Sequence, residues 1–324
     1  MEETLHFLVE KEAANIRQAA ALKDGKVVYS DCWEGFKADD CLHLMSVTKS
    51  IVSILVGIAI DQGLIEGPGQ KVLDFFPEYQ VLRGEHTIQR VCIKDLLTMT
   101  APYKYRSEPW TKVCTSDDWT AAALDLLGGK AGLEGTFRYS TLGIHILTGI
   151  IARTTGKSTS QWANEHLFRP LGIEPCTGYE ALTAEEHKAF ILSRTPKKHI
   201  WFSDPKGVGT AGYGLCLNAM DMARLGQMCL EGGIYDGRRI VSSSWIREMT
   251  SQHASAGPMF QNMGYGYLWW IIDPGKGIYA AIGNSGNVIY VNPMKNVVIA
   301  VTAAFKPTVM DRIQFIQRCI EPRL

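Results

Sequence analysis

A serine and a lysine stand three residues apart in the segment Ser46-Val-Thr-Lys49, and this pair of side chains can perform acyl transfer. The residues after the lysine, Ser50 to Ile60, carry no charge and predict an apolar helix over 46–62. Residues i and i+3 share one helical face about 5 to 6 Å apart at Cβ, so the hydroxyl and the amine can meet. Burial and the positive helix N-terminus lower the pKa of such a lysine, and its neutral amine can then take the serine proton.

The same pair also has a purely structural interpretation. A serine at the start of a helix is most often an N-cap, although that role leaves a lysine among apolar neighbours unexplained. A second match to the spacing, Ser203 to Lys206, contains Pro205 and precedes Gly207, so a continuous helix cannot hold its two side chains on one face. We therefore place the chemistry at Ser46 and interpret the second match as accidental.

The elements that must position this pair follow from apolar periodicity and turn residues. Asp24-Gly25 between two apolar runs predicts a hairpin, and Asn218 predicts a helix cap. Strands are predicted at 16–22, 27–33, 265–272, 278–282, 287–291 and 297–304. Helices are predicted at 46–62, 93–99, 117–127, 140–155, 159–167, from 218 to the glycines at 232–233, and at 309–320.

Strands at both ends of the chain with helices between them predict a mixed α/β (α+β) fold. We expect an antiparallel sheet built from both termini and flanked by helices, made by residues 1–60 and 240–324. Residues 61–239 then form an inserted, mostly helical domain, and the active site lies in the cleft between the two domains.

Composition restricts the class of partner. The 33 basic and 33 acidic residues cancel, so there is no electrostatic signature for binding nucleic acid or a membrane surface. The run Ile51 to Ile60 is too short to span a bilayer, and the acidic start Met1 to Glu10 is unlike a secretion signal. We expect a cytoplasmic protein with a small-molecule substrate, whose eight cysteines are buried reduced thiols. The histidines form no H-E-x-x-H or H-x-H cluster, so a metal hydrolase is poorly supported and no metal or other cofactor is expected.

Three segments resemble, in this order, the motifs of the serine β-lactamase and penicillin-binding-protein superfamily: Met45 to Gly63, Gly135-Thr-Phe-Arg-Tyr-Ser-Thr141 and Gly283-Asn-Ser-Gly-Asn287. The most similar branch contains class C β-lactamases, esterases and 6-aminohexanoate-dimer hydrolases, and the resemblance extends from about residue 20 onward. It implies a β-lactamase-like fold in which Ser46 is acylated, Lys49 is the general base and Tyr139 relays the proton. Beside an ammonium, the pKa of such a phenol is expected to fall toward neutrality.

The same resemblance implies the binding groups. The backbone amides of Ser46 and Asn287 are expected to form the oxyanion hole, with Gly286 leaving room for the substrate. Substrate contacts are expected from Thr141, Asn284, Ser285, Gly286, Tyr103 and Trp110, the last two in an aromatic loop, 101–110, that lies where relatives have a cleft-covering loop. Trp201, Tyr213, Trp269 and Trp270 could belong to the pocket or to the core, and His145 is expected to be a core histidine.

Two positions depart from the family pattern. Asn284 stands where β-lactamases and D,D-peptidases have a lysine or histidine that helps to bind a substrate carboxylate, and Thr141 stands where many relatives have asparagine. These changes argue against penicillins and D-alanyl peptides as preferred substrates, and no glutamate of the class A deacylation type is evident. We expect a serine hydrolase that cleaves a small ester or amide by ping-pong acylation and deacylation. Two alternatives stay open: a binding or sensor protein that has lost turnover, and a D,D-peptidase or β-lactamase.

Overall fold

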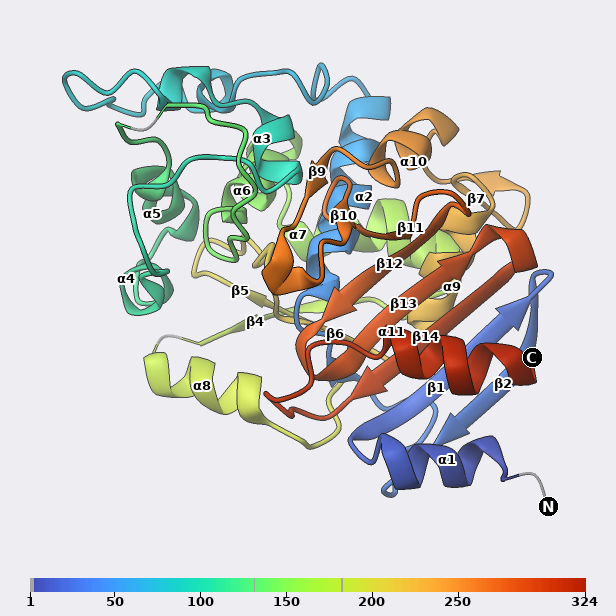
Figure 1. Ribbon diagram of the computed structural model, residues 1–324. Helices are drawn as coiled ribbons and strands as arrows, with labels where there is room; N and C mark the ends of the chain where they lie inside the picture. Colours follow the sequence, from blue (N-terminus) through green and yellow to red (C-terminus); the bar gives the residue numbers. More distant parts are fainter. Residues whose placement is uncertain (1–2, 131, 182) are drawn as a thin grey trace.

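The computed structural model describes residues 3–130, 132–181 and 183–324, and strands from both ends of the chain share its main sheet (Figure 1). The eight strands of this antiparallel sheet follow the order β2-β1-β14-β13-β12-β11-β10-β9. They are β1 Ile16–Lys23, β2 Lys26–Cys32, β9 Ala254–Ser255, β10 Gly264–Tyr265, β11 Trp270–Asp273, β12 Ile278–Gly283, β13 Asn287–Asn292 and β14 Val297–Ala303. The predicted mixed fold, with an antiparallel sheet built from both termini, is confirmed.

The hairpin β1–β2 has the turn that its sequence predicts. Asp24 and Gly25 both have positive φ, 52° and 71°, as a two-residue hairpin turn of type I′ requires. Strand β1 also pairs with β14 on its other side, and nearly every residue of both strands is buried. Strands from the two ends of the chain are therefore paired within the sheet, as its second and third strands.

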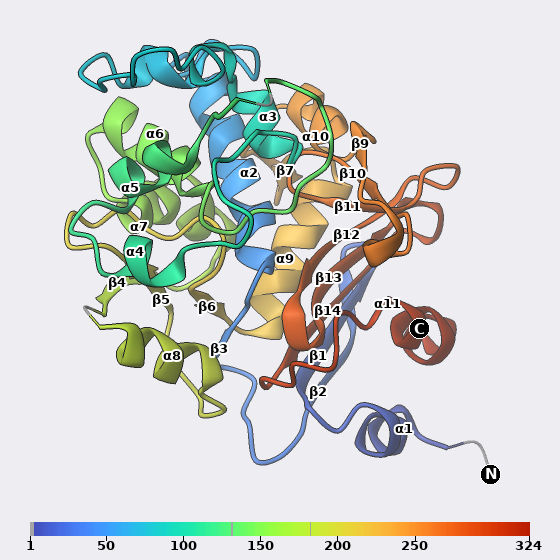
Figure 2. The same cartoon turned by 60° about the vertical axis from the view of Figure 1, so that its left-hand side comes forward.

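Helices cover both faces of this sheet, which Figure 2 shows nearly edge-on. One face carries α2 (Val47–Asp61) and α9 (Ala219–Leu230), while α1 (Leu5–Glu12) and α11 (Ile313–Phe315, continued helically to Ile320) lie on the other. Helix α9 lies so close to β14 that a Cβ at Gly226 would be 2.5 Å from Val298 Cγ1, and the glycine makes this approach possible. Helix α9 packs against β1, β13 and β14, although it lies within the range 61–239 predicted for the helical domain; those domain bounds stay a prediction.

The helical region is less purely helical than predicted. Its helices are α3 Ile93–Leu97, α4 Trp110–Cys114, α5 Trp119–Leu126, α6 His145–Thr155, α7 Thr159–Ala163 and α8 Ala184–Leu192, and α10 (Ser243–Met249) follows a small hairpin, β7 Ile234–Tyr235 with β8 Arg238–Arg239. It also contains a second sheet, β3-β6-β5-β4, made of β3 Leu42–His43, β4 Thr177–Glu180, β5 Ile200–Ser203 and β6 Leu215–Leu217. These strands have two to four residues each, too few to give a periodic pattern in the sequence.

Three predicted elements have different bounds in the structure. The single strand expected at 265–272 is divided between β10 and β11, because Leu268 adopts a φ of 61° and a Cβ at Gly266 would be 2.2 Å from Met249 O. The helix expected from residue 140 begins only at His145, and the one expected from 309 begins at Ile313. In the second case the Ser285 amide binds the Val309 carbonyl, which holds the chain out of the helix.

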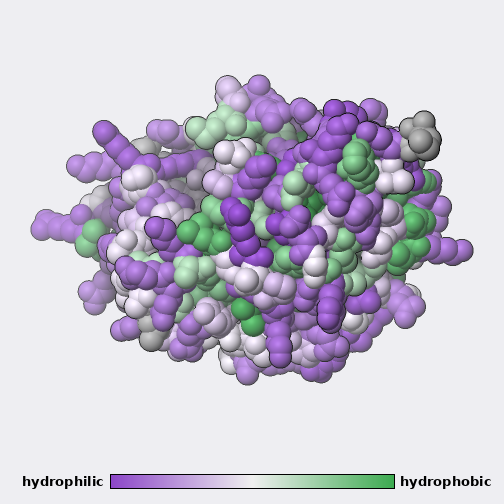
Figure 3. All heavy atoms as spheres, turned by 90° about the horizontal axis from the view of Figure 1, so that it is seen from below, coloured by the Kyte–Doolittle hydropathy of each residue, from purple (hydrophilic) through white to green (hydrophobic). Residues whose placement is uncertain are grey.

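The surface is mostly polar, as expected for a chain with 33 basic and 33 acidic residues. Polar and charged residues cover most of the face shown in Figure 3, where apolar residues form small separate groups. Within the part of the chain that the structure describes, none of the helices combines the length and the apolar character needed to cross a membrane.

Candidate active site

Ser46 lies at the start of α2, and its hydroxyl does not cap the helix. Its Oγ instead accepts a hydrogen bond of 3.0 Å from the Lys49 amine. The preceding residue, Met45, has a φ of 52°, a left-handed conformation that is uncommon for a residue with a side chain and recurs at functional sites. The interpretation of Ser46 as an ordinary N-cap is therefore wrong.

The Lys49 side chain is almost fully buried, with 1% of the residue exposed. Besides Ser46, its Nζ donates to Thr141 Oγ1 at 3.3 Å and to the Gly212 carbonyl oxygen at 2.7 Å. Burial lowers the pKa of Lys49 to about 7, and the negative charge of Glu108 partly opposes this shift. Near neutral pH a large fraction of the amine is therefore unprotonated and can act as a base.

The ring of Tyr139 completes the group, with its centroid 4.8 Å from Lys49 Nζ. Trp270 stacks on this ring at a centroid distance of 6.0 Å, and Phe260 lies 5.6 Å away. Burial raises the pKa of Tyr139 above its ordinary value, and its hydrogen bond to Ser46 only partly opposes that rise. The predicted fall of this pKa toward neutrality is wrong, because burial outweighs the other contributions, so the phenol keeps its proton.

The third motif touches the nucleophile through Gly283 at the end of β12. A Cβ at Gly283 would lie 3.2 Å from the Ser46 amide nitrogen. Asn284 follows and is exposed, whereas Asn287 is fully buried. The Asn287 side chain accepts the Ala303 amide at 2.9 Å and donates to the Asn284 carbonyl at 3.1 Å. Asn287 thus stabilises the turn from within the sheet, and a place for its amide in the oxyanion hole stays a prediction.

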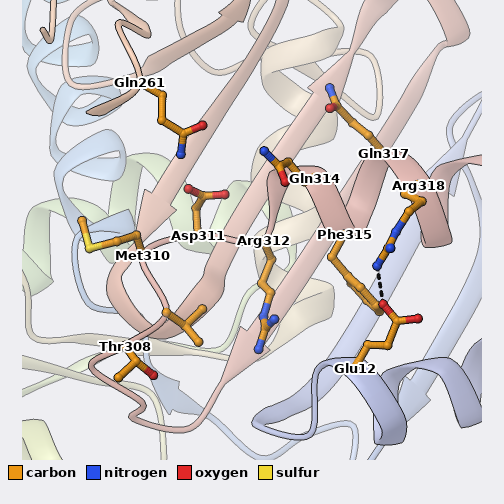
Figure 4. Close-up of a pocket in the computed structure, with 11 residues that line it drawn as sticks. Glu12, Gln261, Thr308, Met310, Asp311, Arg312, Gln314, Phe315, Gln317 and Arg318 are labelled. Atoms are coloured by element: carbon orange, nitrogen blue, oxygen red, sulfur yellow. Dashed lines mark hydrogen bonds and ion pairs between the residues drawn. The ribbon is translucent and has the colours of Figure 1, made fainter. Parts of the chain in front are cut away.

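Two other residues of this motif face the C-terminal segment. Gly286 has a φ of 93°, and a Cβ there would be 2.5 Å from Arg312 Cγ, so the space that we assigned to the substrate holds an arginine side chain. Ser285 is buried, and its Oγ accepts the Lys306 amide at 2.9 Å. The predicted substrate contacts of both residues stay predictions. Arg312 also borders a cavity of about 810 Å³ beside α11, drawn in Figure 4.

Glu108 is a residue of the site to which we assigned no role from the sequence. Its Oε1 accepts the Leu142 amide at 2.9 Å, the Ser140 hydroxyl at 3.0 Å and the Thr141 amide. These contacts hold the residues between Tyr139 and α6 as a turn, which explains why the predicted helix starts late. The one signal in the sequence was an acidic residue in the loop 101–110, whose other charged side chains are basic. The Gly212 carbonyl was also missed, and a backbone group gives no signal of its own.

Comparison with known proteins shows the family of this chain. The family described as Beta-lactamase matches residues 11–316. The chain belongs to the Beta-lactamase family. It is 27% identical over 287 residues to the 6-aminohexanoate-dimer hydrolase of Paenarthrobacter ureafaciens, an alignment that covers 82% of this chain and 66%, just under two thirds, of that enzyme.

Solved structures show the same fold. The octameric penicillin-binding protein homologue from Pyrococcus abyssi has a TM-score of 0.71 at 22% identity, covering 96% of this chain and 76% of that one. A family VIII carboxylesterase has a TM-score of 0.69 at 19% identity, covering 95% and 90%. This Beta-lactamase family member thus shares its fold with these proteins.

Tyr103 and Trp110, the two predicted substrate contacts in the aromatic loop of this family member, differ in their exposure to solvent. Tyr103 is buried, and a Cβ at Gly143 would be 2.1 Å from its ring, so it packs as core. Trp110 is 39% exposed, its ring lies 5.4 Å from that of Tyr213, and it borders a small apolar cavity of about 200 Å³. Both side chains border cavities, Tyr103 one of about 460 Å³ and Trp110 the apolar one, and their predicted substrate contacts stay predictions.

Of the undecided aromatic residues, Trp201, Trp269 and Tyr213 belong to the core, whereas Trp270 also stacks on Tyr139 at the site. Trp201, Trp269, Trp270 and Tyr213 are all buried. His145 is buried as predicted and accepts the Ala211 amide at 3.1 Å, and burial lowers its pKa to about 3, so it stays neutral. The aromatic wall of the site is thus formed by Tyr139, Trp270 and Phe260.

Across residues 3–130, 132–181 and 183–324, one group of side chains has the spacing of a metal site: Cys41, His199 and Asp221. The two ring nitrogens of His199 already contact Asp221 Oδ2 at 2.7 Å and Cys41 Sγ at 3.5 Å. These contacts satisfy the hydrogen-bonding groups of all three residues, and we assign the group no role in the chemistry. The eight cysteines are free thiols, six of them buried.

Proposed function

We propose that this member of the Beta-lactamase family is a serine hydrolase that cleaves a small ester or amide through an acyl-Ser46 intermediate. The observation that carries the proposal is the 3.0 Å contact between Lys49 Nζ and Ser46 Oγ, made by a buried amine whose pKa is lowered to about 7. An unprotonated amine in hydrogen-bond contact with a hydroxyl is the arrangement that activates a serine nucleophile.

In the acylation step Ser46 Oγ bonds to the carbonyl carbon of the substrate while its proton passes to Lys49 Nζ. The tetrahedral intermediate then loses the alcohol or amine, which takes a proton from the Tyr139 hydroxyl, and Lys49 returns a proton to Tyr139. Tyr139 suits this donor role because its raised pKa keeps it protonated. Water then attacks the acyl-enzyme with the same groups acting in reverse, which releases the acid and restores Ser46.

Negative charge develops on the substrate carbonyl oxygen in these steps, and backbone amides that donate hydrogen bonds to this oxygen would stabilise it. The Ser46 amide is one, and the close approach of Gly283 to it favours the next amide, that of exposed Asn284, as the second donor. The Asn287 amide, which is the donor expected from the sequence, is the alternative to that of Asn284.

The substrate class rests on the residues around Ser46 and on two relatives. Asn284 offers no positive charge for a substrate carboxylate, which favours an uncharged ester or amide over penicillins and D-alanyl peptides. One relative is named for hydrolysis of an amide dimer and one structural neighbour is named a carboxylesterase. Both names are those of hydrolases, which supports the proposed hydrolysis of an ester or amide.

The direct test is covalent labelling by a fluorophosphonate, followed by peptide mass spectrometry. We expect the label on Ser46, no label in Ser46→Ala, and unchanged labelling in Ser203→Ala, which removes the serine of the second S-x-x-K match. Hydrolysis of p-nitrophenyl acetate should fall at least about 10³-fold in Ser46→Ala. Labelling that persists in Ser46→Ala would refute the proposal, and a burst of one acetyl group per chain without turnover would favour the binding or sensor protein.

A further inference from the structure

Glu108 gathers several donors on one oxygen atom. Its Oε1 accepts the Thr141 and Leu142 amides and the Ser140 hydroxyl, and Tyr105 donates to the same atom at 3.4 Å. The Ser140 hydroxyl is itself bound, because its Oγ accepts the Gly143 amide at 2.9 Å. One carboxylate thus holds three consecutive residues of the turn before α6, Ser140 to Leu142, and a carboxylate that accepts several backbone amides is a strong anchor.

This turn supplies partners of the proposed base. Thr141 Oγ1 accepts from Lys49 Nζ, and the Tyr139 ring lies against the same amine. On its other side Glu108 belongs to the aromatic loop, two residues before the exposed Trp110. The loop is braced as well by Arg138, which donates to the carbonyls of Tyr103 and Tyr105. A displacement of Glu108 would therefore also move Thr141 and Tyr139, which contact Lys49.

We propose that Glu108 is a positioning residue of the acyl-transfer centre: its carboxylate fixes the turn Tyr139–Leu142, and with it the partners of Lys49, against the wall of the site. The proposal rests on the function proposed for Ser46. Glu108 does not touch the reacting atoms and acts through Thr141 and Tyr139. A shift of about 1 Å in such a group can cost roughly 100-fold in rate.

The negative charge of Glu108 also affects the pH dependence of activity, which a residue that only packs would not change. Among the described residues around Lys49, Tyr139 and Tyr213 have raised pKa values and His145 has a pKa lowered to about 3, so all three are neutral near pH 7. Glu108 is the charged group that raises the pKa of Lys49 against burial. Removing this charge should lower the pKa of Lys49 further, so activity should rise with pH at a lower pH than in the wild type.

The test compares Glu108→Gln, Glu108→Asp and a matched control, Glu85→Gln, by the rate of Ser46 labelling with a fluorophosphonate from pH 5 to 9. Glu85 also accepts three backbone amides in the helical region, those of Thr87, Ile88 and Gly129, but does not contribute to the pKa of Lys49. We expect a rate loss of roughly 10- to 100-fold with a profile moved to lower pH in Glu108→Gln. Glu108→Asp should keep the wild-type profile at a reduced rate, and Glu85→Gln should change neither.

An unchanged rate and profile in folded Glu108→Gln would overturn the proposal. If that variant does not fold, Glu108→Asp decides, because a wild-type rate after shortening the side chain by one methylene would equally overturn it. If Glu85→Gln shifts the profile as much as Glu108→Gln does, the effect is general to the helical region and the proposal is wrong. Failure of wild-type protein to label at Ser46 would instead refute the proposed function, so the two failures are distinguishable.

Discussion

Gly283 packs directly against the backbone of Leu44, so closely that a Cβ at Gly283 would be 2.3 Å from the Leu44 carbonyl oxygen. This contact joins β12 to the segment that ends at Ser46, although Leu44 and Gly283 are 239 positions apart in the chain. Because Gly283 has no side chain, β12 can lie directly against the segment that carries Ser46.

The first prediction concerns Gly283→Ala. The added methyl group must displace either β12 or the segment before Ser46, so p-nitrophenyl acetate hydrolysis should fall roughly 100-fold. The free energy of unfolding, measured with urea, should decrease by about 1 to 3 kcal/mol because of overpacking. Gly69→Ala is the control, since nothing lies within 4 Å of a Cβ there. Wild-type activity in Gly283→Ala would show that the contact does not position Ser46.

The second prediction concerns the pH dependence of activity. The base must be unprotonated, so kcat/KM should rise with pH through a pKa of about 7, the value to which burial lowers Lys49. It should stay level at mildly alkaline pH, because the raised pKa of Tyr139 keeps its proton in place. Measurement of kcat/KM from pH 5 to 9.5 checks both limbs, and activity that decreases from pH 6 to 8 would contradict the assignment of Lys49 as the base.

The third prediction concerns stability in Lys49→Met. The pKa of Lys49 is about 7 when folded and near 10.5 when unfolded, so the unfolded chain binds more protons between these values and stability rises with pH in that window. Below pH 7 the full cost of burying the lysine is present. Removing the amine should therefore raise the free energy of unfolding more at pH 6 than at pH 9.

Urea unfolding at the two pH values measures this difference. Lys94→Met is the control, because Lys94 is exposed and its replacement should have the same small effect at both pH values. An equal change for Lys49→Met at pH 6 and pH 9 would show that Lys49 does not have a lowered pKa in the folded protein.

The fourth prediction separates Trp110 from Tyr103. Trp110→Ala removes an exposed side chain at the mouth of the apolar cavity, so KM for an aryl ester should rise several-fold with little change in thermal stability. Tyr103→Ala removes a buried ring and should cost about 3 to 5 kcal/mol of unfolding free energy. A large loss of stability in Trp110→Ala would place Trp110 in the core instead.

Local signals in the sequence predicted the parts of the fold that depend on neighbouring residues. The Asp24-Gly25 turn, the uncharged helix after Lys49 and the cap at Asn218 were all correct, since each depends on the residues beside it. The short strands of the second sheet were missed because their pairing joins distant segments. The pKa of Tyr139 was predicted to be lowered by one neighbouring charge. Burial raises this pKa instead, and no local pattern in the sequence predicts burial.

By itself the sequence determined the antiparallel sheet built from both termini and the helical spacing that lets Lys49 meet Ser46, because both follow from periodicity and side-chain type. The tertiary structure decided what surrounds that pair: Gly283 against Leu44, Arg312 over Gly286, and Glu108 behind Thr141. Each of these contacts joins residues at least 26 positions apart in the chain. They arise from packing of whole elements, which no short stretch of sequence encodes.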